Sequence, residues 1–171
     1  MFNSPFTTKN PGGSPAVIPE GCSIVFVADL FVNNYVGGAE LTTDALIQSS
    51  KLPVHCVHSK DVTMETLESG HKKYWIFGNM SQLDLQLIPT IVANLNYSIL
   101  EYDYKFCKYR SIEKHEVNEK MPCDCHEQIH GKLMSAFFYG AKSLWFMSEK
   151  QQKVYFDRFP FLAERENWVL S

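Results

Sequence analysis

The sequence predicts an α/β protein with a Rossmann-like, three-layer architecture, in which helices cover both faces of a mostly parallel open sheet. Short, nearly continuous apolar runs alternate along the chain with segments of helical period, which is typical of repeated β-α-β units. The 171 residues are 45% hydrophobic and 20% charged. A chain of this length and composition is expected to bury a sizeable core, so intrinsic disorder is excluded for most of it.

The strands are expected after a lead-in rich in Pro, Gly, Ser and Thr. Residues 1–21 have no apolar period and predict a flexible segment before a single domain over residues 22–171. The first strand, over residues 23–28, is mostly β-branched and apolar, as expected for a strand covered on both faces. Further strands are expected over residues 53–57, 74–77, 97–100, 143–147 and 168–170.

The helices are expected between these strands, over residues 39–50, 62–68, 82–95, 128–139 and 149–156. Asp61, Ser81 and Ser148 are expected to cap three of them. Pro89 lies inside the third and predicts a kink there. Residues 101–122 are polar and aromatic without a clean period, so no helix is expected among them.

Charge and segment composition narrow the class of protein. The formal net charge is -3, from 16 basic and 19 acidic residues, which argues against a nucleic-acid-binding protein. The longest apolar runs fall far short of the ~20 residues of a membrane-spanning helix. The N-terminus lacks the basic and apolar regions of a secretory signal, and five cysteines is an odd count for a disulfide framework. We expect a cytoplasmic protein without a transmembrane segment.

Gly37 and Gly38 follow the first strand and open the first helix. Without side chains they let a ligand approach the backbone, and the N–H groups of a helix start favour an anion by about 0.3–1 kcal/mol. The spacing fits neither the dinucleotide fingerprint nor a P-loop. A tight turn with Glu40 as a first-turn acid explains the same residues.

Two further loops follow strands and offer polar side chains. After the fourth strand, Asp103 could orient a sugar hydroxyl or act as a base, and Lys105 could meet an anionic group. A solvated loop with aromatic anchors explains this segment too. After the fifth strand, helix capping by Ser148 and a first-turn acid, Glu149, account for the sequence, although a ligand role stays open.

Cysteine and histidine residues gather in one part of the chain. Cys123, Cys125 and His126 are followed by His130 at a spacing that shares one helix face, and Cys107 lies upstream. Zinc accepts such mixtures, but its cysteine pairs are usually two to four residues apart, so a single intervening residue disfavours binding by both thiolates. Buried free thiols and a redox-formed loop closure are the alternatives. No metal is firmly implied.

In order along the chain, these loops resemble those of one family. The sequence is similar to the N-terminal, acceptor-side domain of a GT-B glycosyltransferase of the retaining group 1 type, from about residue 23 to residue 171. The motifs that carry the resemblance are Gly-Gly-Ala-Glu at 37–40, Tyr-Asp-Tyr-Lys-Phe-Cys at 102–107, Cys-Asp-Cys at 123–125 and the stretch 141–149 that ends in Ser-Glu. Tyr102 departs from the pattern, because the family usually has histidine there.

The resemblance implies transfer of a sugar from a nucleotide-sugar donor to an acceptor across an interdomain cleft, without a metal requirement. Asp103 is then the catalytic candidate. The candidates for binding the nucleotide-sugar are Gly37, Gly38, Lys105 and Glu149.

The chain ends where the family would enter the linker to its donor-binding domain. The resemblance therefore implies an acceptor-side half that is inactive alone and needs a complementing C-terminal domain or subunit. An exposed face is expected where that domain would pack, so self-association is a further expectation. The alternatives are a non-catalytic module that binds a sugar, a nucleotide or a protein, and a metal- or redox-responsive protein built on the Cys/His cluster.

Overall fold

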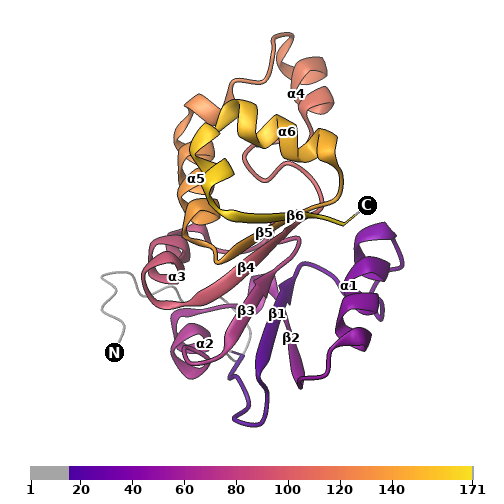
Figure 1. The fold of residues 1–171 in the computed structure, drawn as a ribbon, viewed down its shortest axis with the longest axis vertical. Coiled ribbons are helices and arrows are strands. Elements are labelled where there is room, and N and C mark those ends of the chain that lie inside the picture. The colour runs from indigo at the N-terminus through magenta and orange to yellow at the C-terminus, as the bar shows by residue number, and fades with distance from the viewer. Residues whose placement is uncertain (1–15, 171) are drawn as a thin grey trace. The chain divides into compact units, whose positions relative to one another are not determined.

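The structure, a computed structural model, describes residues 16–170. The chain divides into two compact units, Met1–Tyr97 and Ser98–Ser171. Each unit is built from parallel strands and helices (Figure 1).

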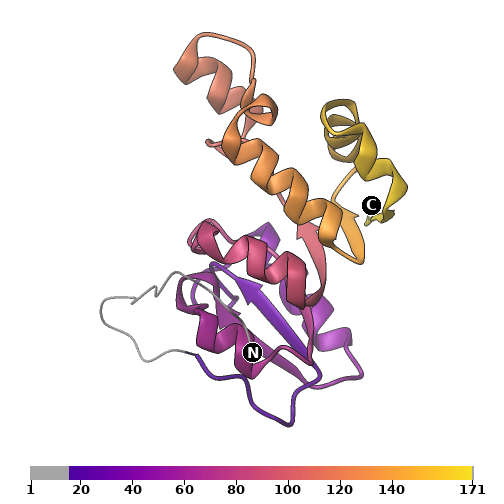
Figure 2. The same ribbon diagram turned by 90° about the vertical axis from the view of Figure 1, so that its left-hand side faces the viewer.

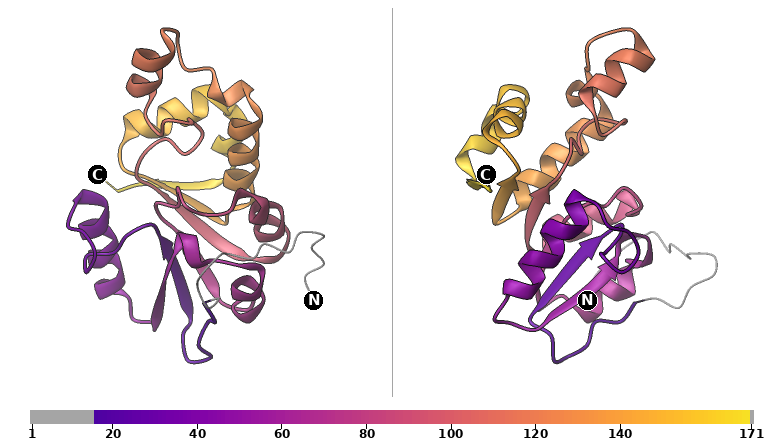
Figure 3. Two further views of the ribbon diagram at one scale, coloured as in Figure 1. Left: turned by 180° about the vertical axis from the view of Figure 1, so that it is seen from behind. Right: turned by 90° about the vertical axis from the view of Figure 1, so that its right-hand side faces the viewer.

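The first unit is centred on β1 (Ile24–Ala28), which pairs in parallel with β2 (Val54–His58) and with β3 (Tyr74–Phe77). Three helices pack around these strands: α1 (Gly38–Ser49), α2 (Met64–Ser69) and α3 (Ile88–Asn94). Views from opposite sides show α1 over one face and α2 with α3 over the other (Figures 2 and 3). Because both faces are covered, Val25, Phe26 and Val27 are all buried.

The second unit continues from β4 (Asn96–Glu101) and contains β5 (Ser143–Phe146) and β6 (Glu166–Val169). β5 pairs in parallel with both of the others. Its helices are α4 (Ile112–Glu119), α5 (Ile129–Gly140) and α6 (Glu149–Arg158), and a 3-10 turn, η3 (Cys125–Glu127), precedes α5. The largest buried side chains here are aromatic: Phe106, Phe137, Phe138, Phe146 and Tyr155.

The predicted fold class is confirmed. The six strands belong to one parallel sheet in the order β2-β1-β3-β4-β5-β6, and helices connect them. The alternation of strands with helices is that of a Rossmann-like α/β fold, and the order is a doubly wound one whose direction reverses between β1 and β3. Within the described residues, no helix is both long and apolar enough to cross a bilayer.

Two helices begin later than the sequence predicts. Thr63, rather than Asp61, caps α2, through a reciprocal pair of hydrogen bonds with Thr66. The helix expected over residues 82–95 is a 3-10 turn, η2 (Leu85–Leu87), followed by α3, and Pro89 lies in the first turn of α3. A first-turn proline loses no helical hydrogen bond, so it starts this helix and makes no kink within it.

The sequence prediction missed α4, between residues 101 and 122. Ser111 caps it by accepting a hydrogen bond from the Lys114 N–H at 3.2 Å, and Lys120 ends it in a left-handed conformation with φ 58°. The helix is short and polar, so it carries no apolar period by which it could be recognised.

The flexible lead-in expected over residues 1–21 lies largely outside the described residues. In its described part, Ile18 is buried and its N–H donates to Ser69 Oγ at 2.9 Å. Lys73 Nζ also donates to the Glu20 carbonyl oxygen at 2.6 Å. Residues 18–20 are therefore attached to the first unit.

Candidate functional site

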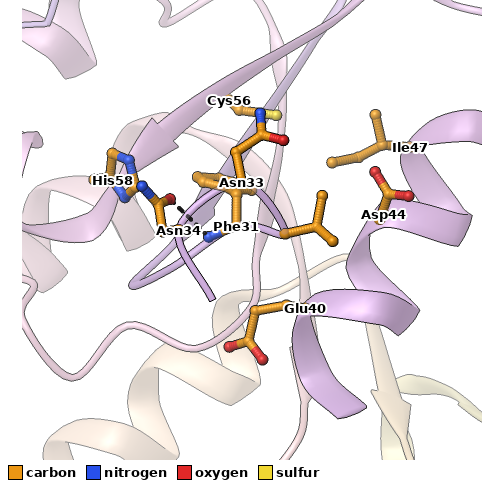
Figure 4. A pocket seen from close by; sticks show the side chains of 9 residues that line it. Phe31, Asn33, Asn34, Glu40, Asp44, Ile47, Cys56 and His58 are labelled. Carbon is orange, nitrogen blue, oxygen red and sulfur yellow. Dashed lines mark hydrogen bonds between the residues drawn. The ribbon is translucent and has the colours of Figure 1, made fainter. Parts of the chain in front are cut away.

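A pocket of about 320 Å³ opens at the carboxyl ends of β1 and β2 in the first unit. Figure 4 shows that its lining comes from the loop after β1, from α1 and from β2. The lining residues are Phe31, Val32, Asn33, Asn34, Glu40, Asp44, Ile47, Cys56 and His58. Carboxyl ends of parallel strands are the usual position of ligand sites in open α/β sheets.

The lining of this pocket combines hydrogen-bonding side chains with an apolar surface. Glu40 and Asp44 supply carboxylates, and none of the nine lining residues is Lys or Arg. His58 Nδ1 lies 3.0 Å from the carbonyl oxygen of Asp29, which can only accept, so the Nδ1–H group donates this hydrogen bond. The pocket therefore suits neutral hydroxyl or amine groups better than a phosphate.

Asp29 holds the loops around the carboxyl end of β1. Its carboxylate accepts hydrogen bonds from the Ser81 N–H at 2.9 Å, from Ser81 Oγ at 2.7 Å, from the Gln82 N–H at 3.2 Å and from the Ser59 hydroxyl. Partial burial raises the pKa of Asp29, but these hydrogen bonds outweigh it and leave the pKa below its ordinary value.

Gly37 and Gly38 lie at the start of α1, as the sequence predicts. A Cβ at Gly37 would lie 2.7 Å from Glu40 Oε2 and 2.8 Å from the Tyr35 ring, whereas a Cβ at Gly38 would meet nothing within 4 Å. Both atoms belong to side chains that can move aside, so a side chain at Gly37 would require only local rearrangement of Tyr35 and Glu40. The pocket lies beside this turn, but neither glycine lines it.

In the second unit, the loop after β4 is organised by Glu101, a residue that the sequence analysis did not single out. Its buried carboxylate accepts hydrogen bonds from the Lys105 N–H at 3.0 Å, the Asp103 N–H at 3.3 Å and the Tyr155 hydroxyl. Lys105 Nζ lies 2.6 Å from Glu101 Oε1. Burial raises the pKa of Glu101, and the Lys105 ammonium opposes that rise.

The two candidates on this loop, Asp103 and Lys105, have partners within the unit. Arg110 makes a two-pronged ion pair with Asp103, with Nε 2.7 Å from Oδ2 and Nη2 3.0 Å from Oδ1. Lys105 is directed to the interior and its side chain is 1% exposed. Gln151 Nε2 donates to the Asp103 carbonyl oxygen at 2.8 Å, which ties this loop to α6.

Glu149 is exposed in the first turn of α6, directly after the cap residue Ser148. Ser148 Oγ accepts a hydrogen bond from the Gln151 N–H at 3.2 Å. These are the interactions of an ordinary helix start, and among the described residues no further contact favours a ligand role for Glu149.

Four buried side chains of the second unit form a group that could hold a metal ion: Cys107, His115, Cys123 and Cys125. Their ligand atoms all lie within 4.8 Å of one another. His115 Nδ1 lies 3.3 Å from Cys125 Sγ and 3.9 Å from Cys107 Sγ. The sequence left a metal site here as one of several alternatives, and the geometry of this group is consistent with it.

The group is assembled by the fold of residues 102–128. Cys107 lies in a tight turn, in which its N–H donates to the Tyr104 carbonyl at 2.9 Å and its own carbonyl accepts from the Arg110 N–H at 2.8 Å. Arg110 adopts a left-handed conformation, with φ 56°, and leads into α4, which carries His115. After α4 the chain folds back, and this brings the sulfur atoms of Cys123 and Cys125 close to the ligand atoms of Cys107 and His115.

Burial strongly affects the thiol of Cys123. Desolvation raises the pKa of Cys123 to about 12, and a hydrogen bond from the Cys125 backbone only partly opposes this rise. In the absence of a cation this thiol therefore stays protonated, whereas a metal ion would bind it as the thiolate.

The membership of the group differs in part from the sequence-based candidates. Cys107, Cys123 and Cys125 belong to it, but His126 and His130 do not. His130 Nε2 lies 2.9 Å from the Lys105 carbonyl oxygen, and His126 packs edge-on against Phe159. The fourth member, His115, was missed, although it lies eight residues after Cys107 and eight before Cys123.

Comparison with known proteins identifies no relative. No protein-family model, no curated protein and no solved structure matches this chain.

Proposed function

We propose that this chain is the acceptor-side half of a GT-B-type glycosyltransferase, and that it holds the acceptor to which a sugar is transferred from a nucleotide-sugar donor. The pocket between the loop after β1 and α1 carries the proposal, and its ligand would be a neutral, hydroxyl-rich acceptor. A complementing C-terminal domain or subunit would bind the donor, so this chain alone would transfer sugar inefficiently.

The position of the pocket supports this proposal. It lies at the carboxyl ends of two parallel strands, beside the Gly-Gly turn that carries the first motif of the family resemblance. Its volume of about 320 Å³ is at the lower end of the range for small-molecule sites and would accommodate one or two sugar rings.

The chemistry of the pocket favours an acceptor over a donor diphosphate. Two carboxylates and two asparagine amides offer acceptors and donors for hydroxyl groups, while Phe31 and Ile47 offer an apolar surface for a sugar ring face. A diphosphate would be repelled by Glu40 and Asp44, and no lining lysine or arginine compensates for this repulsion.

Titration calorimetry with a panel of neutral saccharides and nucleoside diphosphates tests the proposal. We expect saturable binding of a saccharide and about tenfold weaker binding to Asp44→Asn, because a hydrogen bond to a charged group contributes about 1.5–3 kcal/mol. Glu65→Gln is the control and should bind the saccharide as the wild type does, because Glu65 lies on α2, outside the pocket. Equal saccharide affinity in wild type and Asp44→Asn would reject the site.

A product assay separates the transferase from a non-catalytic binding module. The chain is mixed with the saccharide that binds, a nucleotide-sugar and a complementing donor-binding domain, and the saccharide is analysed by mass spectrometry. Addition of one sugar supports the transferase. Saturable saccharide binding without donor turnover indicates the module.

A further inference from the structure

We propose that Cys107, His115, Cys123 and Cys125 bind one Zn²⁺ ion in a closed Cys3His site that holds α4 in the second unit. The site is independent of the acceptor pocket, because all four residues lie within Ser98–Ser171 and the pocket lies in the first unit. The two proposals can therefore fail separately.

The distances within the group match those of a tetrahedral zinc site. With Zn–S bonds of ~2.3 Å and Zn–N bonds of ~2.0–2.1 Å, tetrahedral geometry places sulfur about 3.6 Å from nitrogen and sulfurs about 3.8 Å apart. The His115 Nδ1 atom lies 3.3 Å and 3.9 Å from two of the sulfurs, and the whole set fits within 4.8 Å. Small side-chain movements would suffice to close the set around one ion.

The donor set and its burial favour zinc in a structural role. Three thiolates and one imidazole are typical of closed tetrahedral zinc sites, whereas magnesium and calcium require oxygen ligands. All four residues are buried, so four protein ligands complete the coordination and leave no open position for a reacting water. Binding Zn²⁺ releases one proton from each of the three thiols and leaves a site of net charge −1.

The second ring nitrogen of His115 also fits this assignment. Among the described residues, His115 Nε2 is one of the buried side-chain atoms without a hydrogen bond, and the nearest carboxylate oxygen, Asp124 Oδ1, lies 3.7 Å away. Histidines that bind metals usually donate the other ring N–H to a carboxylate. A slight approach of Asp124 would provide that hydrogen bond.

The packing of α4 explains why such a site is needed. The helix has eight residues, fewer than an isolated helix needs to be stable in water. His115 is its only buried residue, so α4 has no apolar face to hold it in place. Cys107 precedes the helix and Cys123 and Cys125 follow it, so one ion would join both ends of the segment to its middle.

Zinc analysis of the reduced, untagged protein tests this proposal directly. After expression in zinc-supplemented medium, elemental analysis by inductively coupled plasma mass spectrometry should find about one zinc per chain. Co²⁺ exchange should give the absorption bands of a tetrahedral thiolate site in the wild-type protein, a readout that does not depend on the folding of any variant. Removal of the zinc with a chelator should increase proteolytic cleavage within residues 108–122.

Matched variants identify the ligands. Cys107→Ser and His115→Ala should lose at least about tenfold in zinc affinity. Cys56→Ser and His126→Ala should keep the metal, because Cys56 is exposed in the first unit and His126 lies outside the group. Asp124→Asn should keep one zinc but bind it about tenfold more weakly in a chelator competition.

Several results would overturn the proposal. Substoichiometric zinc despite excess metal and reductant would do so, as would stoichiometric iron. An intramolecular disulfide among Cys107, Cys123 and Cys125 in the protein kept reduced would also reject it. Loss of zinc in His126→Ala together with its retention in His115→Ala would reject this ligand set.

Discussion

Lys105 Nζ lies 2.6 Å from Glu101 Oε1, and both side chains are 1% exposed. Glu101 ends β4, and its carboxylate also accepts hydrogen bonds from two backbone N–H groups of the following loop and from the Tyr155 hydroxyl. A single buried carboxylate thus sets the path of the chain toward Cys107. The proposed zinc site begins two residues after this ion pair.

Removing one partner of the buried pair should destabilise the protein more than removing both. Glu101→Ala leaves the Lys105 ammonium buried without its partner, so the free energy of unfolding should fall by about 3–5 kcal/mol. The double variant Glu101→Met/Lys105→Met should lose less, because apolar side chains of similar volume need no charge partner. Urea unfolding of the three proteins measures this. A double variant less stable than Glu101→Ala would contradict the prediction.

Gly131 should tolerate no side chain. A Cβ built on this residue of α5 would lie 2.0 Å from the Cys125 carbonyl oxygen and 2.7 Å from His126 Cα, which are backbone atoms that cannot move aside easily. Gly131→Ala should therefore reduce the free energy of unfolding by about 1–3 kcal/mol and weaken metal binding through Cys125. Thermal unfolding and zinc content are the measurements.

Gly38→Ala is the matched control for this variant. A Cβ at Gly38 would meet no atom within 4 Å, and Gly38 is a helical residue in the first turn of α1. Stability should be unchanged or higher by about 0.4–1 kcal/mol, because alanine restricts the unfolded chain. An equal loss of stability in Gly38→Ala and Gly131→Ala would show that the clash with the Cys125 carbonyl is not what destabilises Gly131→Ala.

Stability at acidic pH should depend on Asp29. Its folded pKa is lowered, so the carboxylate stabilises the folded state above its unfolded pKa of about 3.9, and this contribution is lost as the pH falls through the folded pKa. Asp29→Asn should unfold more easily by about 1–3 kcal/mol at pH 7, because it loses acceptors for Ser59, Ser81 and Gln82. Below about pH 4 the difference from wild type should shrink.

Urea unfolding at pH 7, 5, 4 and 3 measures this pH dependence. Asp157→Asn serves as control, because Asp157 is exposed and pairs with Lys153 in an i,i+4 ion pair on α6, which contributes about 0.3–0.5 kcal/mol at most. A difference between Asp29→Asn and wild type that stays constant from pH 7 to pH 3 would contradict the assigned role of the carboxylate.

The strands were the most predictable part of the fold. β1 and β3 lie within one residue of their expected positions, because a run of buried β-branched and aromatic side chains is a local pattern. Helix starts were less predictable. Thr63 caps α2 although Asp61 was also suitable, and α3 starts with Pro89 in its first turn and without any side-chain cap.

The candidate sites were only partly accessible from sequence. The sequence pointed to three of the four candidate metal ligands, Cys107, Cys123 and Cys125. It did not point to His115, because α4 is polar and gives no periodic signal. Likewise Glu101 ends an apolar strand as a lone acid, and only its contacts with Lys105 and Tyr155 show its role. The catalytic and nucleotide-sugar roles of Asp103, Lys105 and Glu149 stay predictions.

The sequence by itself determined the parallel α/β architecture and the residue types available for chemistry, because strand and helix patterns depend on neighbours a few positions apart. Only the tertiary structure decided which of those residues meet. Left-handed turns at Arg110 and Lys120 bring His115 to three cysteines, and the loop after β1 brings Asn33 near Asp44 and His58 in one pocket. These clusters depend on contacts between residues far apart in the chain, and periodicity and composition carry no information about such contacts.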